Sequence, residues 1–274
     1  MEEDNFLLIG LVPEHRVFAQ FDRYTPVADY LAGEIRRKIN LIVIPDYGSF
    51  TDDFLTTGMD AAFLGSYSYA ILHAQSGVEP LARPEGPDGL STYHGVIFTR
   101  KDSGIRTAAD MKAKRFVFVD KVSAAGYLLP LVYFKKNGIE DYRSYFKEWY
   151  VAGTHDDAIY DVLDGKADIG AAKSTVLATL AKTDPRVLSE LEVLEVSPEF
   201  PENALCIRRE LDASLKAALK MALLTMHQDP RGREVLNKFG AGRFIETSDT
   251  DYQPLYQYIR RAGIDLVDFR HMDE

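Results

Sequence analysis

Hydrophobic residues in the first part of the chain follow two repeats, one typical of strands and one typical of helices. The apolar run over residues 7–12 ends at Pro13 and predicts a buried strand. Thr25 followed by Pro26 predicts a helix start, because a hydroxyl N-cap and a proline at the first helical position favour one. The other elements predicted here are a helical face of Val27, Leu31, Ile35 and Ile39, strands over 41–44 and 61–64, and a short helix capped by Thr51. This order is typical of an α/β fold with mostly parallel sheets.

The same order restarts in the second half of the chain. Strands are predicted over 116–119, over 149–152 and from Ile169, with helices over 123–138 and 156–163 between them. In both halves a glycine-containing turn that ends in aspartate, at 58–60 and at 165–168, leads into a strand. Three helices near 214–227, 232–238 and 252–261 follow. The repeated order indicates two similar lobes.

Two extended runs, 93–99 and 204–207, are interpreted as the segments that cross between these lobes. Residues 1–96 with 204–274 then form lobe one, and residues 97–203 form an inserted lobe two, with hinges near 93–99 and 201–207. Two crossing segments allow the lobes to rotate against each other. A single continuous sheet without a hinge is the alternative that the pattern leaves open.

Composition and charge narrow the class of protein. The chain has 274 residues, of which 46% are hydrophobic, enough for two cores. A formal net charge of −10 without a long basic block argues against nucleic-acid binding. No apolar run reaches the length of a membrane span, and the acidic start is no signal peptide, so an exported protein would have lost its leader. Cys206, the one cysteine, is predicted to lie in a buried strand.

The strongest local signal for a binding site is the segment 120–126, between a predicted strand and a predicted helix. The backbone amides of Ala124, Ala125 and Gly126 are first-turn helix donors, and no Asp or Glu occupies that first turn, which suits an anion. Ser123 precedes them and would add a hydroxyl. The alternative is that Ser123 serves only as the helix N-cap.

Other candidate residues follow strands, where α/β proteins collect ligands. His155 lies at a predicted helix start, and with a pKa near 6.5 it would gain charge as the pH falls. His15 is expected to be exposed. Four tyrosines at predicted strand ends or turns offer a ring and a hydroxyl, although any of them could be a packing residue. They are Tyr47, Tyr67, Tyr69 and Tyr93. No ligand spacing predicts a metal, and no nucleophile or phosphate-loop motif predicts an enzyme.

Taken in order, these motifs resemble the phosphate- and phosphonate-binding proteins of ABC importers, which have the type 2 periplasmic binding fold. The resemblance covers nearly the whole chain and rests on segments 25–31, 46–47, 65–69, 100–105, 120–130, 153–155, 165–168 and 201–211. It implies a two-lobed α/β protein that closes on a small anion in the cleft between the lobes. It also implies a periplasmic location, an importer permease as partner and no cofactor. A ligand-sensing domain of a membrane signalling protein is the first alternative, and an enzyme on the same fold is the second.

The resemblance also implies which residues contact the ligand. Ser123 and His155 match positions that bind the phosphonate, whereas Ala124 and Ala125 stand where hydroxyls are common. Asn203 and Thr175 replace acids that bind a ligand's amino group, which disfavours a zwitterionic aminophosphonate and leaves phosphate, phosphite, methylphosphonate or another small anion open. The full candidate set is Tyr47, Ser66, Tyr67, Tyr93, Ser123, Ala124, Ala125, Gly126, His155 and Asn203.

Overall fold

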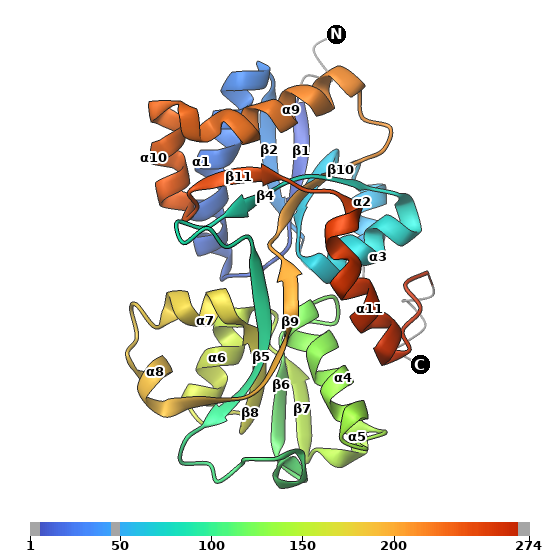
Figure 1. Ribbon diagram of the computed structural model, residues 1–274, viewed down its shortest axis with the longest axis vertical. Helices are drawn as coiled ribbons and strands as arrows, with labels where there is room; N and C mark the ends of the chain where they lie inside the picture. Colours follow the sequence, from blue (N-terminus) through green and yellow to red (C-terminus); the bar gives the residue numbers. More distant parts are fainter. Residues whose placement is uncertain (1–5, 45–49, 268–274) are drawn as a thin grey trace.

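Two β-sheets, each flanked by helices, organise the chain (Figure 1). The computed structural model describes residues 6–44 and 50–267. We call the part around the six-stranded sheet the first lobe and the part around the five-stranded sheet the second lobe. The first lobe contains β1 (Phe6–Leu11), α1 (Val17–Ile35), β2 (Lys38–Val43), α2 (Phe50–Thr56), β3 (Ala61–Leu64), α3 (Ser66–Ser76), β4 (Glu79–Glu85), β10 (Ala204–Ile207), α9 (Ala213–Thr225), α10 (Pro230–Phe239), β11 (Arg243–Glu246) and α11 (Gln253–Ala262).

The second lobe is formed by the chain between β4 and β10. It contains β5 (Thr92–Arg100), β6 (Arg115–Phe118), a π-helical turn (Ala124–Leu128), α4 (Leu129–Lys136), α5 (Tyr142–Tyr145), β7 (Glu148–Val151), α6 (His155–Leu163), β8 (Ile169–Lys173), α7 (Ser174–Leu180), α8 (Arg186–Glu190) and β9 (Leu191–Pro201). Short 3-10 turns cover Ala108–Met111, Met226–Gln228 and Asp249–Tyr252. The chain therefore passes between the sheets twice, after β4 and after β9. The predicted boundaries of the inserted lobe stay a prediction.

Both sheets are mixed. In the order β11-β4-β10-β3-β1-β2, strand β1 pairs in parallel with β2 and β3, while β10 runs antiparallel to β3 and β4. In the order β7-β6-β8-β5-β9, strand β6 pairs in parallel with β7 and β8, while β5 runs antiparallel to β8 and β9. Strand β11 also runs antiparallel to β4. The parallel strands end at the edge of each sheet that faces the other lobe, which places their following loops between the lobes.

Helix α1 differs from its prediction. The helix begins at Val17 and passes through Pro26, instead of starting there. Proline removes one backbone hydrogen bond from a helix interior, but Tyr24 on the preceding turn packs its ring 4.8 Å from Phe63 and 5.2 Å from Phe239. Burial of that turn holds the helix together on both sides of the proline. The helix ends at Ile35, so Ile39 lies in β2.

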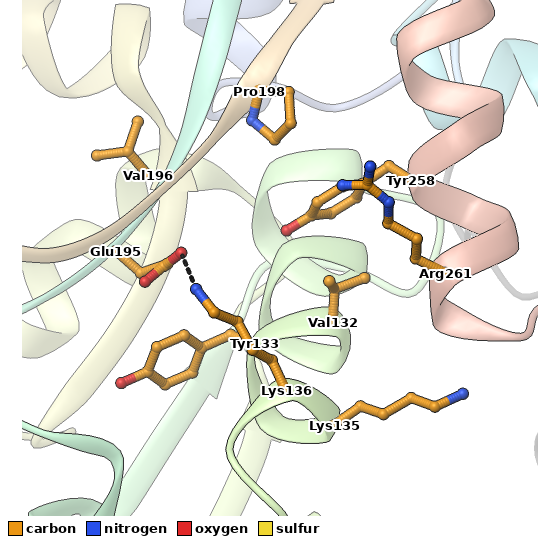
Figure 2. Close-up of a pocket in the computed structure, with 9 residues that line it drawn as sticks. All are labelled: Val132, Tyr133, Lys135, Lys136, Glu195, Val196, Pro198, Tyr258 and Arg261. Atoms are coloured by element: carbon orange, nitrogen blue, oxygen red, sulfur yellow. Dashed lines mark ion pairs between the residues drawn. The ribbon is translucent and has the colours of Figure 1, made fainter.

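The C-terminal helix α11 reaches from the first lobe to the second (Figure 1), where it contacts α4 and β9. Between these three elements lies an open groove with a volume of about 410 Å³ (Figure 2). Its walls are apolar at Val132 and Tyr258, and Lys136 pairs across it with Glu195 at 3.6 Å. This groove is lined by none of the candidate ligand-binding residues.

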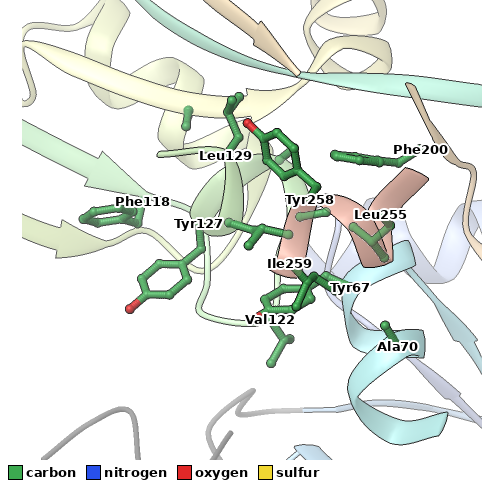
Figure 3. Packing of buried hydrophobic residues seen from close by; sticks show 14 of the residues in the cluster. Tyr67, Ala70, Phe118, Val122, Tyr127, Leu129, Phe200, Leu255, Tyr258 and Ile259 are labelled. Atoms are coloured by element: carbon green, nitrogen blue, oxygen red, sulfur yellow. The ribbon is translucent and has the colours of Figure 1, made fainter. Parts of the chain in front are cut away.

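One hydrophobic cluster joins the two lobes. Tyr67 and Ala70 from α3 lie beside Val122, which precedes the π-helical turn, and Ile259 from α11 packs next to them (Figure 3). Phe200 from β9 contacts Tyr258 at 5.5 Å between ring centroids. Two further clusters fill the outer faces of the sheets, under α1, α9 and α10 in the first lobe and under α6, α7 and α8 in the second. The structure therefore shows the lobes in contact, in a closed arrangement.

Candidate ligand-binding site

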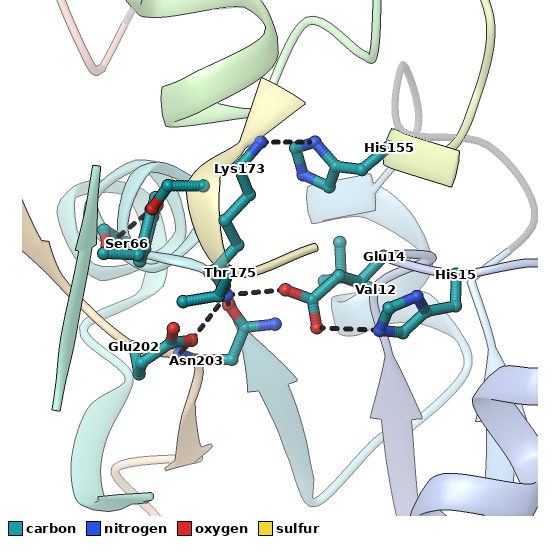
Figure 4. Close-up of polar contacts among 12 residues, drawn as sticks. Val12, Glu14, His15, Ser66, His155, Lys173, Thr175, Glu202 and Asn203 are labelled. Atoms are coloured by element: carbon teal, nitrogen blue, oxygen red, sulfur yellow. Dashed lines mark hydrogen bonds and ion pairs between the residues drawn. The ribbon is translucent and has the colours of Figure 1, made fainter. Parts of the chain in front are cut away.

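A buried polar cluster lies where the loop after β1, the end of β8 and the connection from β9 to β10 meet (Figure 4). Lys173, at the end of β8, has a side chain that is only 3% exposed. Its Nζ lies 2.5 Å from Glu14 Oε1, 2.5 Å from Glu202 Oε2 and 3.1 Å from Asn203 Oδ1. The same Nζ lies 4.4 Å from the centroid of the Tyr93 ring. We call Glu14, Tyr93, Glu202 and Asn203 the ammonium cage.

Charges inside the cage stabilise one another. Burial alone would raise the pKa of Glu14, but the nearby cations Lys173 and Arg23 outweigh it and hold that pKa well below its usual value. Burial alone would lower the pKa of Lys173, but the carboxylates of Glu14 and Glu202 outweigh it and raise that pKa. Lys173 and Glu14 are therefore both ionised at neutral pH, as a buried ion pair must be to repay its desolvation.

Ser66 and Tyr93 connect this cluster to the end of strand β9. Ser66 Oγ donates a hydrogen bond of 2.6 Å to the carbonyl oxygen of Pro201, at the end of β9. With its only proton used there, Ser66 Oγ accepts from Tyr93 Oη at 3.2 Å. Burial raises the pKa of Tyr93 to about 12, so its hydroxyl stays protonated. Ser66, Tyr93 and Asn203 thus come together as predicted candidates, on three different segments.

Residues 14–16 bind the start of α6 from across the gap between the lobes. The amide of His155 donates to the carbonyl oxygen of Glu14 at 3.3 Å. His15 Nδ1 lies 3.2 Å from Asp156 Oδ1, and the guanidinium of Arg16 donates to Asp157 Oδ1 at 2.8 and 2.9 Å. We call these contacts the interlobe latch. The prediction that His15 is exposed is wrong: its side chain is 12% exposed because Glu14 and Asp156 pack around it.

His155 has a fixed tautomer. The backbone N–H of Lys173 donates to His155 Nδ1 at 3.1 Å, so the proton of the neutral ring lies on Nε2. Burial lowers the pKa of His155 to about 4, despite the nearby carboxylate of Glu14. The expectation that this ring gains charge near pH 6.5 is therefore wrong. His155 offers instead a neutral Nε2–H donor at neutral pH.

The segment after β6 forms a π-helical turn before α4. Ser123 Oγ accepts from the amide of Gly126 at 2.9 Å, so the N-cap role that the sequence left open is present. The carbonyl of Ser123 accepts from both Tyr127 and Leu128. Among the described residues, none accepts a hydrogen bond from the amide of Ala124 or Ala125.

Small residues in this turn are required by packing. A Cβ added at Gly126 would lie 2.3 Å from Val119 Cβ, and one added at Gly95 would lie 2.9 Å from Ala125 Cα. Such contacts are far inside van der Waals separation, so glycine at these positions brings the turn close to β5 and β6. Helix α3, which carries Ser66 and Tyr67, contacts the turn from the first lobe. Ala124, Ala125 and Gly126 consequently lie buried between the lobes.

Residues 9–252 match the family model described as "ABC transporter, phosphonate, periplasmic substrate-binding protein". The chain belongs to this family. As a member of the phosphonate-binding family, it is 26% identical over 261 residues to the phosphonates-binding periplasmic protein of Escherichia coli, covering 93% of this chain and 76% of that one.

Solved structures share the fold of this family member. The binding-protein component of an ABC phosphonate transporter from Pseudomonas aeruginosa superposes with a TM-score of 0.86 at 20% identity, covering 95% of this chain and 87% of that one. PhnD1 from Prochlorococcus marinus, in complex with methylphosphonate, gives a TM-score of 0.82 at 21% identity, covering 94% and 98%. These matches confirm the type 2 periplasmic binding fold. The family model describes a transport component, and the comparisons give no support to a sensor domain.

Sequence reasoning missed the three charged residues at the centre of the cluster, Glu14, Lys173 and Glu202. A signal was available, because Glu14 follows a buried strand and Lys173 ends one, and the carboxyl ends of parallel strands face the cleft. Of the predicted residues, Tyr67 is fully buried in α3, and Tyr47 lies outside the described residues. The role of each predicted residue in binding stays a prediction.

Two further properties bear on function. In the described part of the chain, His, Cys, Asp and Glu side chains do not gather in any group of three or more that would hold a metal ion. None of the helices within residues 6–44 and 50–267 combines the length and the apolar character that a bilayer-spanning segment needs.

Proposed function

We propose that this chain is the substrate-binding component of an ABC importer and holds a small oxyanion of the phosphonate, phosphite or phosphate type. The observation that carries the proposal is a set of donors without acceptors. The amides of Ala124 and Ala125 have no acceptor among the described residues, and the neutral ring of His155 keeps its Nε2–H available. The turn that carries the two alanine amides follows β6, and His155 follows β7, the strand paired with β6.

The chemistry of these donors favours an anion. Unpaired amides at the start of a helix carry partial positive charge, and the first turn here contains no acidic side chain. Ser123, whose Oγ already accepts from Gly126, keeps its hydroxyl proton to donate. Donors that are fixed before binding lose little entropy when an oxyanion arrives. Tetrahedral oxyanions, with three or more acceptor oxygens, match such a set.

The relatives support the type of ligand. The Prochlorococcus marinus PhnD1 structure contains methylphosphonate, and the Escherichia coli relative is a phosphonates-binding protein. We infer that the protein works in the periplasm and delivers its ligand to a permease. It binds its ligand without changing it chemically.

A thermal-shift screen tests this proposal. Protein is first unfolded, dialysed and refolded to remove retained ligand, and then melted with phosphate, phosphite, methylphosphonate or sulfate, against chloride at equal ionic strength. At a ligand concentration one hundred times Kd, binding adds about 2.7 kcal/mol to the free energy of unfolding. For a chain of this size that raises Tm by about 5 °C or more. Unchanged melting with all four oxyanions would contradict the proposal.

A further inference from the structure

The ammonium cage is built as a binding site for a primary ammonium group. Two carboxylates, an amide oxygen and an aromatic face surround one nitrogen atom, Lys173 Nζ. Carboxylates and carbonyl oxygens accept the three N–H donors of an ammonium, and an aromatic face attracts its charge. Glu14 comes from the loop after β1 in the first lobe, and Glu202 and Asn203 come from the connection between β9 and β10. Tyr93 comes from β5, and Lys173 comes from the end of β8 in the second lobe.

The charges of the site balance only when Lys173 is present. Glu14 and Glu202 supply two negative charges. Lys173 supplies one positive charge, and Arg23, whose Nη1 lies 3.6 Å from Glu14 Oε2, supplies another. Removal of the Lys173 ammonium would leave one uncompensated negative charge in a buried space. A monovalent cation of similar shape would restore the balance.

We propose that Lys173 acts as a built-in ammonium ligand, which fills the cage and thereby determines which substrates the interlobe site accepts. This inference rests on the proposed function and deepens it. The backbone N–H of Lys173 donates to His155 of the oxyanion site while its side chain ends in the cage, so one residue contacts both sites. A ligand that carries both an oxyanion and an ammonium group would compete with Lys173 for the cage. The native protein therefore selects small oxyanions without a cationic arm.

This explanation differs from the one that the sequence suggested. Replacement of two family acids by Asn203 and Thr175 predicted that no ammonium site exists. The structure contains two carboxylates beside Asn203, Glu14 and Glu202, and the chain's own lysine occupies them. The selectivity against zwitterions is thus assigned to Lys173, and a single substitution should reverse it.

The test is to empty the cage and refill it. Lys173→Ala removes three side-chain carbons and the ammonium nitrogen, which together correspond to propylammonium. Propylammonium is therefore the probe. Propylammonium chloride should raise the Tm of Lys173→Ala by several degrees more than it raises that of the wild type, whose cage is filled. Lys173→Met is the matched control, because it fills the same space without a charge, and propylammonium should not stabilise it specifically. An equal Tm shift in Lys173→Ala and Lys173→Met would overturn the inference.

A second variant covers the case in which Lys173→Ala does not fold. Lys173→Ala combined with Glu14→Gln leaves one carboxylate and no excess charge, and propylammonium should still stabilise it more than it stabilises Lys173→Met. If neither variant folds alone, the refolded yield with and without propylammonium gives the same readout. A yield that does not respond to propylammonium also contradicts a cage for ammonium.

Calorimetric titrations separate this inference from the proposed function. Methylphosphonate titrated into the wild type tests the oxyanion site alone. With 2-aminoethylphosphonate, Lys173→Ala should bind about tenfold or more tightly than the wild type, because a charge-assisted contact is gained. If methylphosphonate binds the wild type but 2-aminoethylphosphonate binds both proteins equally, the role of Lys173 is wrong and the oxyanion site stands. If methylphosphonate does not bind, the proposed function fails, and the propylammonium result still decides whether the cage is an ammonium site.

Discussion

At the scale of single residues, the hydrogen bond from Lys173 N–H to His155 Nδ1 determines what His155 can do. It leaves the ring proton on Nε2, and burial keeps the ring neutral. The neutral ring can donate to an oxyanion throughout the neutral pH range. The ring therefore contributes a directed hydrogen bond rather than a charge that appears only in acid.

The buried ring of His155 predicts how stability changes with pH. Its pKa is lowered to about 4 in the folded chain, with Glu14, Lys173, His15 and Asp156 facing it. An unfolded histidine has a pKa near 6.5. Between these values the unfolded state binds more protons, so the free energy of unfolding falls as the pH falls below 6.5. Between pH 6.5 and 4.5 the loss should be on the order of 2 kcal/mol.

Denaturant unfolding at several pH values measures this loss. His155→Gln keeps an acceptor for Lys173 N–H but does not titrate, and should flatten the dependence between pH 6.5 and 4.5. His94→Gln is the matched control, because the His94 side chain is 42% exposed, and it should keep the wild-type dependence. A wild-type slope that persists in His155→Gln would show that His155 is not the group responsible. Below pH 4.5 protonation of Glu14, whose pKa is lowered, adds to the loss.

Some residues of the site were predictable from local pattern and others were not. Ser123 and His155 follow predicted strands, so their place near the cleft follows from the α/β rule alone. Glu14 and Lys173 also adjoin strands, but the role of each depends on its ion pair with the other, 159 positions away in the chain. The fixed tautomer of His155 likewise depends on the contact between the end of β8 and the start of α6. Contacts between distant segments are set by topology, which hydrophobic periodicity does not contain.

At the scale of elements, periodicity predicted the strands and helices that bury one clear face. The helices predicted near 156–163, 232–238 and 252–261 agree with α6, α10 and α11 to within two residues. Strand β9, which runs over Leu191–Pro201, was missed because its inward and outward residues do not alternate regularly. Its mixed pattern reflects its place at the edge of the second sheet, next to a crossing.

The π-helical turn shows why a helix prediction was only partly correct. The sequence predicted one helix over 123–138, whereas the chain forms a π-helical turn followed by α4 over Leu129–Lys136. Pro130, near the start of α4, has no N–H to continue a regular ladder. Gly126 allows the turn to pack directly on Val119. Ala124 and Ala125 are the first residues of this turn, so their amides have no acceptor within it, which is the feature that the proposed function uses.

At the scale of the whole molecule, two kinds of contact hold the lobes together. The interlobe latch and the ammonium cage are polar, whereas α11 packs on α4 and β9 of the second lobe. The latch consists of polar contacts, and the Arg16 side chain in it is 62% exposed. Such exposed ion pairs contribute little free energy. In contrast, α11 packs on the second lobe through buried rings such as Tyr258. Opening should therefore break the latch and the cage while α11 and the two crossings act as the hinge.

Small-angle scattering tests this motion. The ligand-free, refolded protein should have a larger radius of gyration than the closed structure, and saturating methylphosphonate should reduce it. Lobes that rotate as rigid bodies about a hinge produce this change. Lys173→Met, which removes the ion pairs of Lys173 with Glu14 and Glu202, should shift the ligand-free protein further toward the open form. Identical profiles with and without ligand would indicate a body that does not close.

The most direct test of the central claim, that the turn at Ser123 holds the oxyanion, is the Kd of Ser123→Ala for methylphosphonate, measured by calorimetry together with its Tm. Loss of a hydrogen bond to a charged ligand should weaken binding by about tenfold to a hundredfold. Loss of the N-cap should also cost about 1 kcal/mol of stability. Thr107→Ala removes an exposed N-cap hydroxyl elsewhere in the second lobe and should lower Tm without changing Kd. The account predicts that only Ser123→Ala changes the Kd; a lower Tm with an unchanged Kd in Ser123→Ala would contradict it.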